Sequence, residues 1–128
     1  MGSSTPLGRV RGLGSAKEGV HHWWHQRLTA GSNLLLMVWL IVSVARLPGY
    51  DYASVHTWLT SAWVALPMAM LILSTFYHFR LGLQVVIEDY QHDESRVVMM
   101  ILLNLFTFTL GGIAIFAILK VAFTGAAA

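Results

Sequence analysis

Three long stretches of this sequence contain no charged residue, and they constrain the fold more than any other feature. They hold 18, 28 and 23 residues and lie between Arg27 and Arg46, Asp51 and Arg80, and Arg96 and Lys120. Each is long enough for a helix across a hydrocarbon layer roughly 30 Å thick, which takes about 20 residues. Lipid offers no partner to backbone N–H and C=O groups and three segments cannot close a barrel, so each span must be helical. The prediction is an all-α membrane protein with three transmembrane helices, whose spans lie at about 28–47, 57–79 and 97–121, and the second helix continues to residue 90 as a cytoplasmic extension.

The composition excludes several classes of protein. Of the 128 residues, 56% are apolar and 11% are charged, whereas a soluble domain carries about a quarter charged residues. The absence of cysteine excludes disulfides, cysteine-ligated zinc or iron–sulfur clusters, and thiol nucleophiles. A net charge of +2 gives no nucleic-acid footprint, so no nucleic-acid partner is expected.

Basic residues predict the orientation of the spans. Six of them precede the first span or lie between the second and third, namely Arg9, Arg11, Lys17, Arg27, Arg80 and Arg96. Two lie on the other side, Arg46 and Lys120. The positive-inside rule therefore places the N-terminus in the cytoplasm and the C-terminus on the far side. The first 27 residues contain no apolar core of a cleavable signal peptide.

The N-terminal tail divides in two. Residues 1–15 are rich in glycine and serine and predict a flexible cytoplasmic arm. Residues 16–128 form a single membrane-anchor domain, which begins with a short interfacial helix over 16–27. Trp23 and Trp24 are placed there at the depth of the lipid headgroups.

One histidine has an unusual position. Of the six histidines, His78 alone lies inside a long apolar stretch. Ionisable groups in spans are rare and usually functional, which favours a haem ligand or a proton relay, although a lone histidine can also bond a neighbouring helix. The helical pattern continues past it, and a helix over 57–90 would be about 51 Å long, so its end must project beyond the bilayer core. Asp89 shares the face of His78 about 16 Å along the axis, and Gly82 leaves that face open for a flat cofactor or for close helix packing.

A haem at His78 would need a second chain. Low-spin b-type haem commonly has two axial imidazoles, and this chain offers one at the right depth. His21 and His25 are spaced for metal chelation, but no carboxylate completes such a site. Taken alone, Asp89 and Tyr90 are more typical of a polar helix end with an interfacial tyrosine than of a binding site.

Two motifs connect the chain to a known family. They are GSAKEGVHHWWHQRLTA at residues 14–30 and HFRLGLQVVIEDY at residues 78–90. With the three-span layout, they make the chain resemble the small hydrophobic membrane-anchor subunit of succinate dehydrogenase, respiratory complex II, of the alphaproteobacterial type. The resemblance covers essentially the whole sequence.

The resemblance implies roles for five residues. His78 would be an axial ligand of the iron of haem b, and Arg27 would face the haem propionates. His21 would belong to the same polar region. Tyr90 would donate a hydrogen bond to a ubiquinone carbonyl, and Asp89 would support that pocket and its proton path.

The resemblance also implies partners. The chain would be half of a two-subunit haem-binding helix bundle, completed by a second membrane anchor of the cytochrome b556 type that supplies the other haem ligand. A flavoprotein subunit with FAD and an iron–sulfur subunit would dock on it and oxidise succinate, so the chain would be part of an enzyme without being catalytic alone. It would reside in the bacterial inner membrane with its C-terminus in the periplasm, in the respiratory chain and the tricarboxylic acid cycle. The alternative is a haem-free membrane scaffold of a fumarate reductase-type complex.

Overall fold

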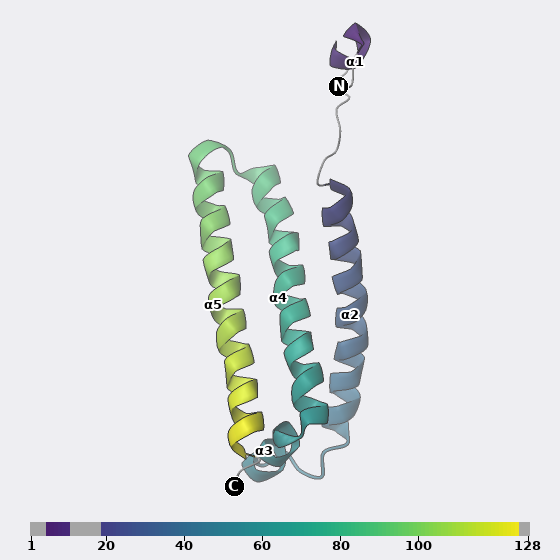
Figure 1. The fold of residues 1–128 in the computed structure, drawn as a ribbon, viewed down its shortest axis with the longest axis vertical. Helices are drawn as coiled ribbons and strands as arrows, with labels where there is room; N and C mark the ends of the chain where they lie inside the picture. Colours follow the sequence, from purple (N-terminus) through teal and green to yellow (C-terminus); the bar gives the residue numbers. More distant parts are fainter. Residues whose placement is uncertain (1–4, 11–18, 126–128) are drawn as a thin grey trace.

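The described part of the chain folds into three long helices and two short ones (Figure 1). The structure, a computed structural model, describes residues 5–10 and 19–125. Within these ranges every regular element is helical. The helices are α1 (Pro6–Val10), α2 (Gly19–Ala45), α3 (Tyr52–Thr60), α4 (Ala62–Tyr90) and α5 (Asp93–Gly125). The prediction of an all-α protein is confirmed for the described residues.

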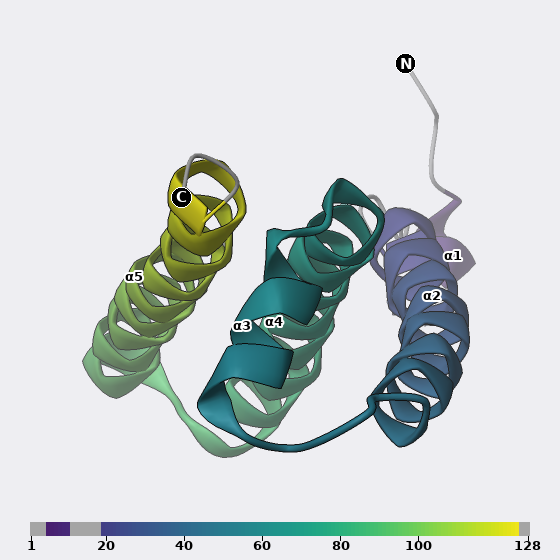
Figure 2. The ribbon, with the colours of Figure 1, turned by 90° about the horizontal axis from the view of Figure 1, so that it is seen from below.

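Three helices are long and apolar enough to cross a membrane, as predicted. They are α2, α4 and α5, with 27, 29 and 33 residues. Helix α4 packs against α2 on one side and against α5 on the other, and the described residues of α2 and α5 do not contact each other. The view along the helices shows the three in a row and not in a closed bundle (Figure 2). A row of this kind leaves two broad helix faces without a partner from the described part of this chain.

The buried core is correspondingly thin. Among the described residues it is centred on α4, where Leu71, Leu81 and Ile87 are buried, and on α5, where Leu103 and Thr107 are buried. Many large apolar side chains on all three long helices are exposed. Exposed apolar surface is expected on a protein that lies in lipid or is covered by another subunit.

The first long helix differs from the prediction at its start. Helix α2 runs from Gly19 to Ala45 without a break, so the boundary predicted at residue 27, between an interfacial helix and a span, is not a helix end. No proline and no capping pattern interrupts the sequence there, and the helix therefore continues. Residues 16–18, and residues 1–4 and 11–15 of the predicted arm, lie outside the described residues.

The start of the second predicted helix is also corrected. The prediction placed one helix over 57–90, but the backbone is extended at Ser61, which separates α3 from α4. Asp51 begins α3 as its N-cap, since its carboxylate accepts a hydrogen bond from the Ser54 amide at 3.1 Å. The end at Tyr90 agrees with the prediction, and a sharp turn leads into α5.

Candidate functional site

His78 lies half-buried on α4 and faces α2. Its Nδ1 is 2.9 Å from the Oγ1 of Thr29. The Thr29 hydroxyl has one hydrogen, and Oγ1 lies 2.7 Å from the carbonyl oxygen of His25, to which it donates. Oγ1 therefore accepts from Nδ1–H of His78, which leaves Nε2 as the ring nitrogen with a free lone pair. A metal-binding histidine is commonly held in this way, with its other ring nitrogen donating to a fixed oxygen.

The contact belongs to a longer polar seam between α2 and α4. We use this name for His25, Thr29, Ser32, Ser74, Tyr77 and His78. The hydroxyls of Ser32 and Ser74 are 2.7 Å apart, and the Tyr77 hydroxyl lies 3.0 Å from Nδ1 of His25. Small hydroxyl side chains let two helices approach closely in a membrane and bond across the interface. The polar seam thus holds α2 in register against the helix that carries His78.

Two buried polar atoms on α2 have no partner among the described residues. They are Nε2 of His22 and Oε1 of Gln26. These residues are one turn apart and precede Thr29, so they extend the polar seam toward the α4–α5 turn. A Cβ built on Gly82 would meet only Nε2 of Gln26 within 4 Å, at 3.6 Å. The region one turn from His78 is therefore uncrowded and carries polar groups that a bound molecule could satisfy.

Two predicted site residues lie elsewhere on α2. Arg27 is exposed, and its guanidinium carbon is 5.4 Å from the ring centre of Trp23. Arg27 is two residues from Thr29, about 200° around the helix, so it points away from His78. His21 is exposed and lies about 12 Å along the axis from Thr29. The structure does not bring either residue to His78 within this chain.

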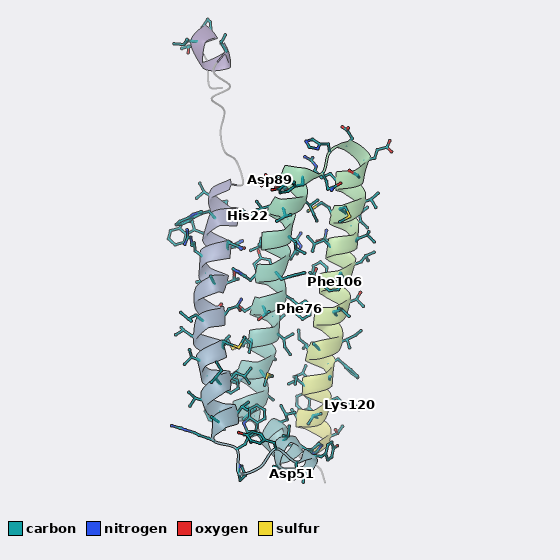
Figure 3. The ribbon with its side chains drawn as sticks, turned by 180° about the vertical axis from the view of Figure 1, so that it is seen from behind. His22, Asp51, Phe76, Asp89, Phe106 and Lys120 are labelled. Carbon is teal, nitrogen blue, oxygen red and sulfur yellow. The ribbon has the colours of Figure 1, made fainter. Side chains whose placement is uncertain are left out.

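Asp89 and Tyr90 lie at the end of α4. Both are exposed, and 77% of Tyr90 is accessible. Figure 3 shows Asp89 and His22 at the same end of the helix row, beside the α4–α5 turn. Tyr90 is twelve residues beyond His78, about 18 Å along the axis. The two predicted quinone-site residues therefore face an open surface at one end of the polar seam.

An arginine–asparagine pair in the apolar region was missed by the sequence reasoning. Nε of Arg80 donates to Oδ1 of Asn104 at 2.6 Å and links α4 to α5. Asn104 is the one amide side chain within the third predicted span, and this position could have indicated a hydrogen bond to a neighbouring helix. Thr29 was missed as well, because a threonine in a span has no distinguishing pattern until the register of two helices is known.

A large cavity lies alongside the polar seam. Its volume is about 750 Å³, and its wall combines Ser74 and Tyr77 of α4 with Thr29 and Ser32 of α2 and with apolar residues of α5. No group of three or more histidine, aspartate or glutamate side chains in residues 5–10 and 19–125 could hold a metal ion.

Comparison with known proteins gives a consistent result. Residues 1–111 match the family model described as succinate dehydrogenase/fumarate reductase transmembrane subunit. A succinate dehydrogenase hydrophobic membrane anchor subunit of Rickettsia bellii is 33% identical over 100 residues, which cover 77% of this chain and 80% of the relative. The protein with that name from Paracoccus denitrificans is 27% identical over 116 residues, covering 91% and 90%. No solved structure shows a significant match.

Proposed function

The chain belongs to the succinate dehydrogenase/fumarate reductase transmembrane subunit family, and from that premise we propose that it binds a haem b through His78 and forms part of a ubiquinone site at Asp89 and Tyr90. It is a multi-pass membrane protein and a subunit of an enzyme complex, to which it contributes the membrane anchor. The observation that carries the haem proposal is the contact of Thr29 with Nδ1 of His78.

The surroundings of His78 suit a haem. The Thr29 contact fixes the imidazole ring and keeps Nε2 free to bind iron. Gly82 leaves room one turn away, and the unpartnered atoms of His22 and Gln26 offer hydrogen-bonding groups toward the α4–α5 turn. A bound haem would supply a site for one-electron transfer, whose potential depends on its axial ligands. This chain would fix one ligand and shape one wall.

The second axial ligand would come from a partner. Two imidazoles commonly hold a low-spin haem b, and the open helix row supplies one. A second small anchor, of the cytochrome b556 type, would pack on an open face of the row and complete a bundle around the haem. The role of Arg27 at the propionates and that of His21 also require this arrangement, because within this chain Arg27 points away from His78 and His21 lies about 12 Å along the axis from Thr29.

Quinone reduction requires two electrons and two protons. The Tyr90 hydroxyl would donate a hydrogen bond to a carbonyl oxygen of ubiquinone, where negative charge develops as electrons arrive. Asp89 precedes it at the same helix end and would relay protons from the aqueous side. The exposure of both side chains leaves them free to meet a quinone and a docked protein.

The soluble partners would dock at the same end. A flavoprotein with FAD and an iron–sulfur protein would oxidise succinate and deliver electrons near Tyr90. Six of the eight basic residues are on this side of the spans, which supports a cytoplasmic location for this end in a bacterium and a periplasmic location for the α3 end of the row.

The Tyr90→Phe variant tests the quinone role. In the purified complex, we expect succinate oxidation with an artificial acceptor to continue while ubiquinone reduction falls by about 100-fold, since one lost transition-state hydrogen bond costs about 10²–10³ in rate. Tyr50→Phe is the matched control, because Tyr50 is an exposed tyrosine near the opposite end of the row. Full ubiquinone activity in Tyr90→Phe would remove Tyr90 from the proposed site.

A further inference from the structure

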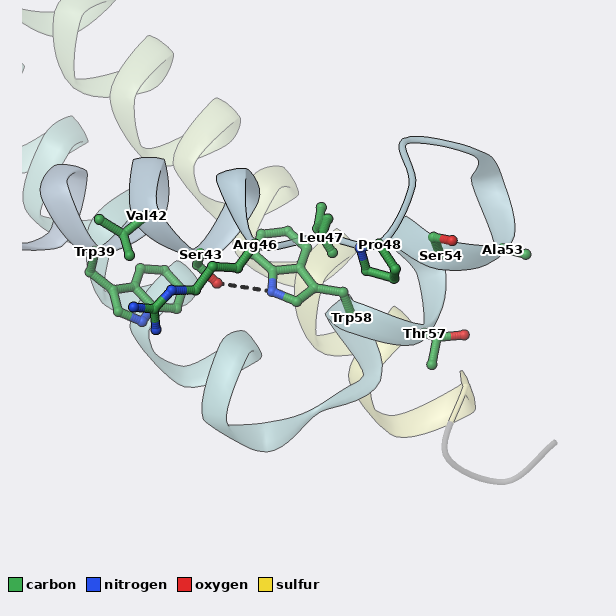
Figure 4. A pocket seen from close by; sticks show the side chains of 10 residues that line it. All are labelled: Trp39, Val42, Ser43, Arg46, Leu47, Pro48, Ala53, Ser54, Thr57 and Trp58. Atoms are coloured by element: carbon green, nitrogen blue, oxygen red, sulfur yellow. Dashed lines mark hydrogen bonds between the residues drawn. The ribbon is translucent and has the colours of Figure 1, made fainter.

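A second cavity lies at the α3 end of the molecule, far from His78. Its volume is about 680 Å³, and it lies between the end of α2, the following loop and α3 (Figure 4). We call it the outer cleft. Its lining includes Trp39, Val42, Ser43, Arg46, Leu47 and Trp58.

The α2 wall of the outer cleft changes from charged to apolar along the helix. Trp39, Val42 and Arg46 are spaced three and four residues apart, so they share one face of α2. Arg46 lies just past the end of the helix, and Trp39 lies about 10 Å deeper along its axis. A cation at the membrane surface with apolar side chains below it follows the layout of a lipid, from headgroup to acyl chain.

The opposite wall is held in place by specific contacts. Nε1 of Trp58 on α3 donates to Oγ of Ser43 on α2 at 3.0 Å, a bond drawn in Figure 4. The indole N–H of Trp58 therefore already has an acceptor, and the face of the ring remains available to contact a ligand. Asp51 caps α3 and so fixes the helix that carries this wall. The outer cleft thus exists before a ligand enters.

The charge in the outer cleft has no partner in the described part of the chain. Within residues 5–10 and 19–125, Arg46 bonds through its backbone amide, and its guanidinium has no hydrogen bond or ion pair. Asp51 is an acid close to it in sequence, but its carboxylate is outside the lining and accepts hydrogen bonds from Ser54. A guanidinium without a partner at the membrane surface favours a phosphate oxygen as its acceptor.

We propose that the outer cleft binds one anionic phospholipid. Its phosphate would accept hydrogen bonds from Arg46, and the upper part of an acyl chain would lie against Trp39 and Val42. A lipid is favoured over a peptide segment because the outer cleft lies at the end of the three spans, where tryptophan and arginine side chains meet headgroups. This site is independent of the proposed haem and quinone roles.

Native mass spectrometry of the complex, purified from membranes in mild detergent, tests the proposal. Phosphatidylglycerol, phosphatidylethanolamine and inorganic phosphate are added separately to wild type, Arg46→Gln and Lys120→Gln. Lys120 is a matched control, since it is an exposed cation near the same end of the row but outside the outer cleft (Figure 3). We expect one phosphatidylglycerol bound to this chain in wild type and Lys120→Gln, and roughly fivefold weaker binding in Arg46→Gln.

Several results would overturn the proposal. Equal retention of phosphatidylglycerol in Arg46→Gln and wild type would exclude Arg46 as the headgroup site. Equal binding of phosphatidylethanolamine would exclude selection of an anionic headgroup. Displacement of the lipid by millimolar inorganic phosphate would indicate a site for free anions. Loss of a partner protein from Arg46→Gln, with the lipid count unchanged, would show that this partner covers the outer cleft.

Discussion

The Thr29 hydroxyl is a single group on which the chemistry of His78 depends. It accepts from Nδ1–H and donates to the His25 carbonyl oxygen, so it determines which ring nitrogen stays free. Thr29→Val keeps the shape and removes the hydroxyl. We expect 10- to 100-fold weaker haem binding in this variant, the usual effect of losing a hydrogen bond to a metal ligand.

Thr29→Ser is the matched control, because it retains the hydroxyl. The haem content of the purified complex and its redox titration measure the effect in both variants. If Thr29→Val and Thr29→Ser bind haem equally, the hydrogen bond between Thr29 and His78 does not position the imidazole, and His78 is held by packing alone.

The Arg80–Asn104 hydrogen bond makes a second prediction at this scale. Removing the Asn104 amide leaves a partly buried guanidinium donor without its acceptor. A double-mutant cycle with Asn104→Leu and Arg80→Met should give a coupling free energy of about 0.6–1.7 kcal/mol for unfolding of the complex, the range of interhelical bonds in membranes. Additive effects of the two substitutions in thermal unfolding would show that the pair contributes nothing to stability.

Individual residues also show which parts of the site could be predicted from the sequence. His78 is conspicuous because an ionisable side chain in a span is rare, and Asp89 and Tyr90 follow from the end of the helical pattern. Thr29 could not be assigned, because its contact with His78 depends on the register of α2 against α4. The roles of all five residues stay predictions, and those of Arg27 and His21 also need a partner protein, since both side chains are exposed and neither reaches His78 within this chain.

At the scale of elements, the length of the uncharged stretches predicts where the spans lie. It does not predict the residues at which the helices begin and end. Helix α2 begins before the predicted span because residues 19–27 keep a helical pattern up to the apolar stretch. Helix α3 is separate from α4 because Asp51 caps it and Ser61 is extended. Caps act over a few residues, whereas the charge pattern reports only on stretches of about twenty residues.

The cap of α3 gives a prediction about pH. Hydrogen bonds from the Ser54 hydroxyl and amide hold the pKa of the Asp51 carboxyl below its ordinary value of 3.8. A lowered pKa in the folded state stabilises the fold above pH 3.8, and this contribution is lost as the pH falls through the lowered pKa.

In hydrogen exchange at neutral pH, Asp51→Ala should speed exchange in α3, whereas Asp51→Asn keeps a good cap and should not. Equal exchange in Asp51→Ala and wild type would contradict the capping role.

At the scale of the whole molecule, the open row of helices explains why this chain needs partners. In the described part of the chain, helices α2 and α5 do not pack on each other and are linked through α4 and, at one end, through α3, and large apolar side chains remain exposed on every long helix. The sequence predicted three spans correctly, but it contains no signal for the order of helices in the row. That order depends on which faces pack, and the polar residues that pair across those faces cannot be matched until the register of the helices is known.

Because the row of helices offers one candidate axial histidine, we predict that haem binding requires the second anchor. When the tagged chain is produced without its partners, we expect haem below about one tenth of stoichiometry, since a single ligand holds the iron weakly. Co-production with the second anchor should restore one haem per pair, measured as the pyridine haemochrome. One haem per isolated chain would mean that both ligands lie within this sequence.

The most direct test of the central claim is the reduced-minus-oxidised optical spectrum of the purified complex. The wild-type complex should show the α-band of a b-type haem, and His78→Ala should lose or shift that band because an axial ligand is missing. His92→Ala is the control, since His92 lies exposed in the α4–α5 turn and should leave the band unchanged. The absence of an α-band in wild type, or an unchanged band in His78→Ala, would contradict the assignment of His78 as a haem ligand and favour a haem-free scaffold.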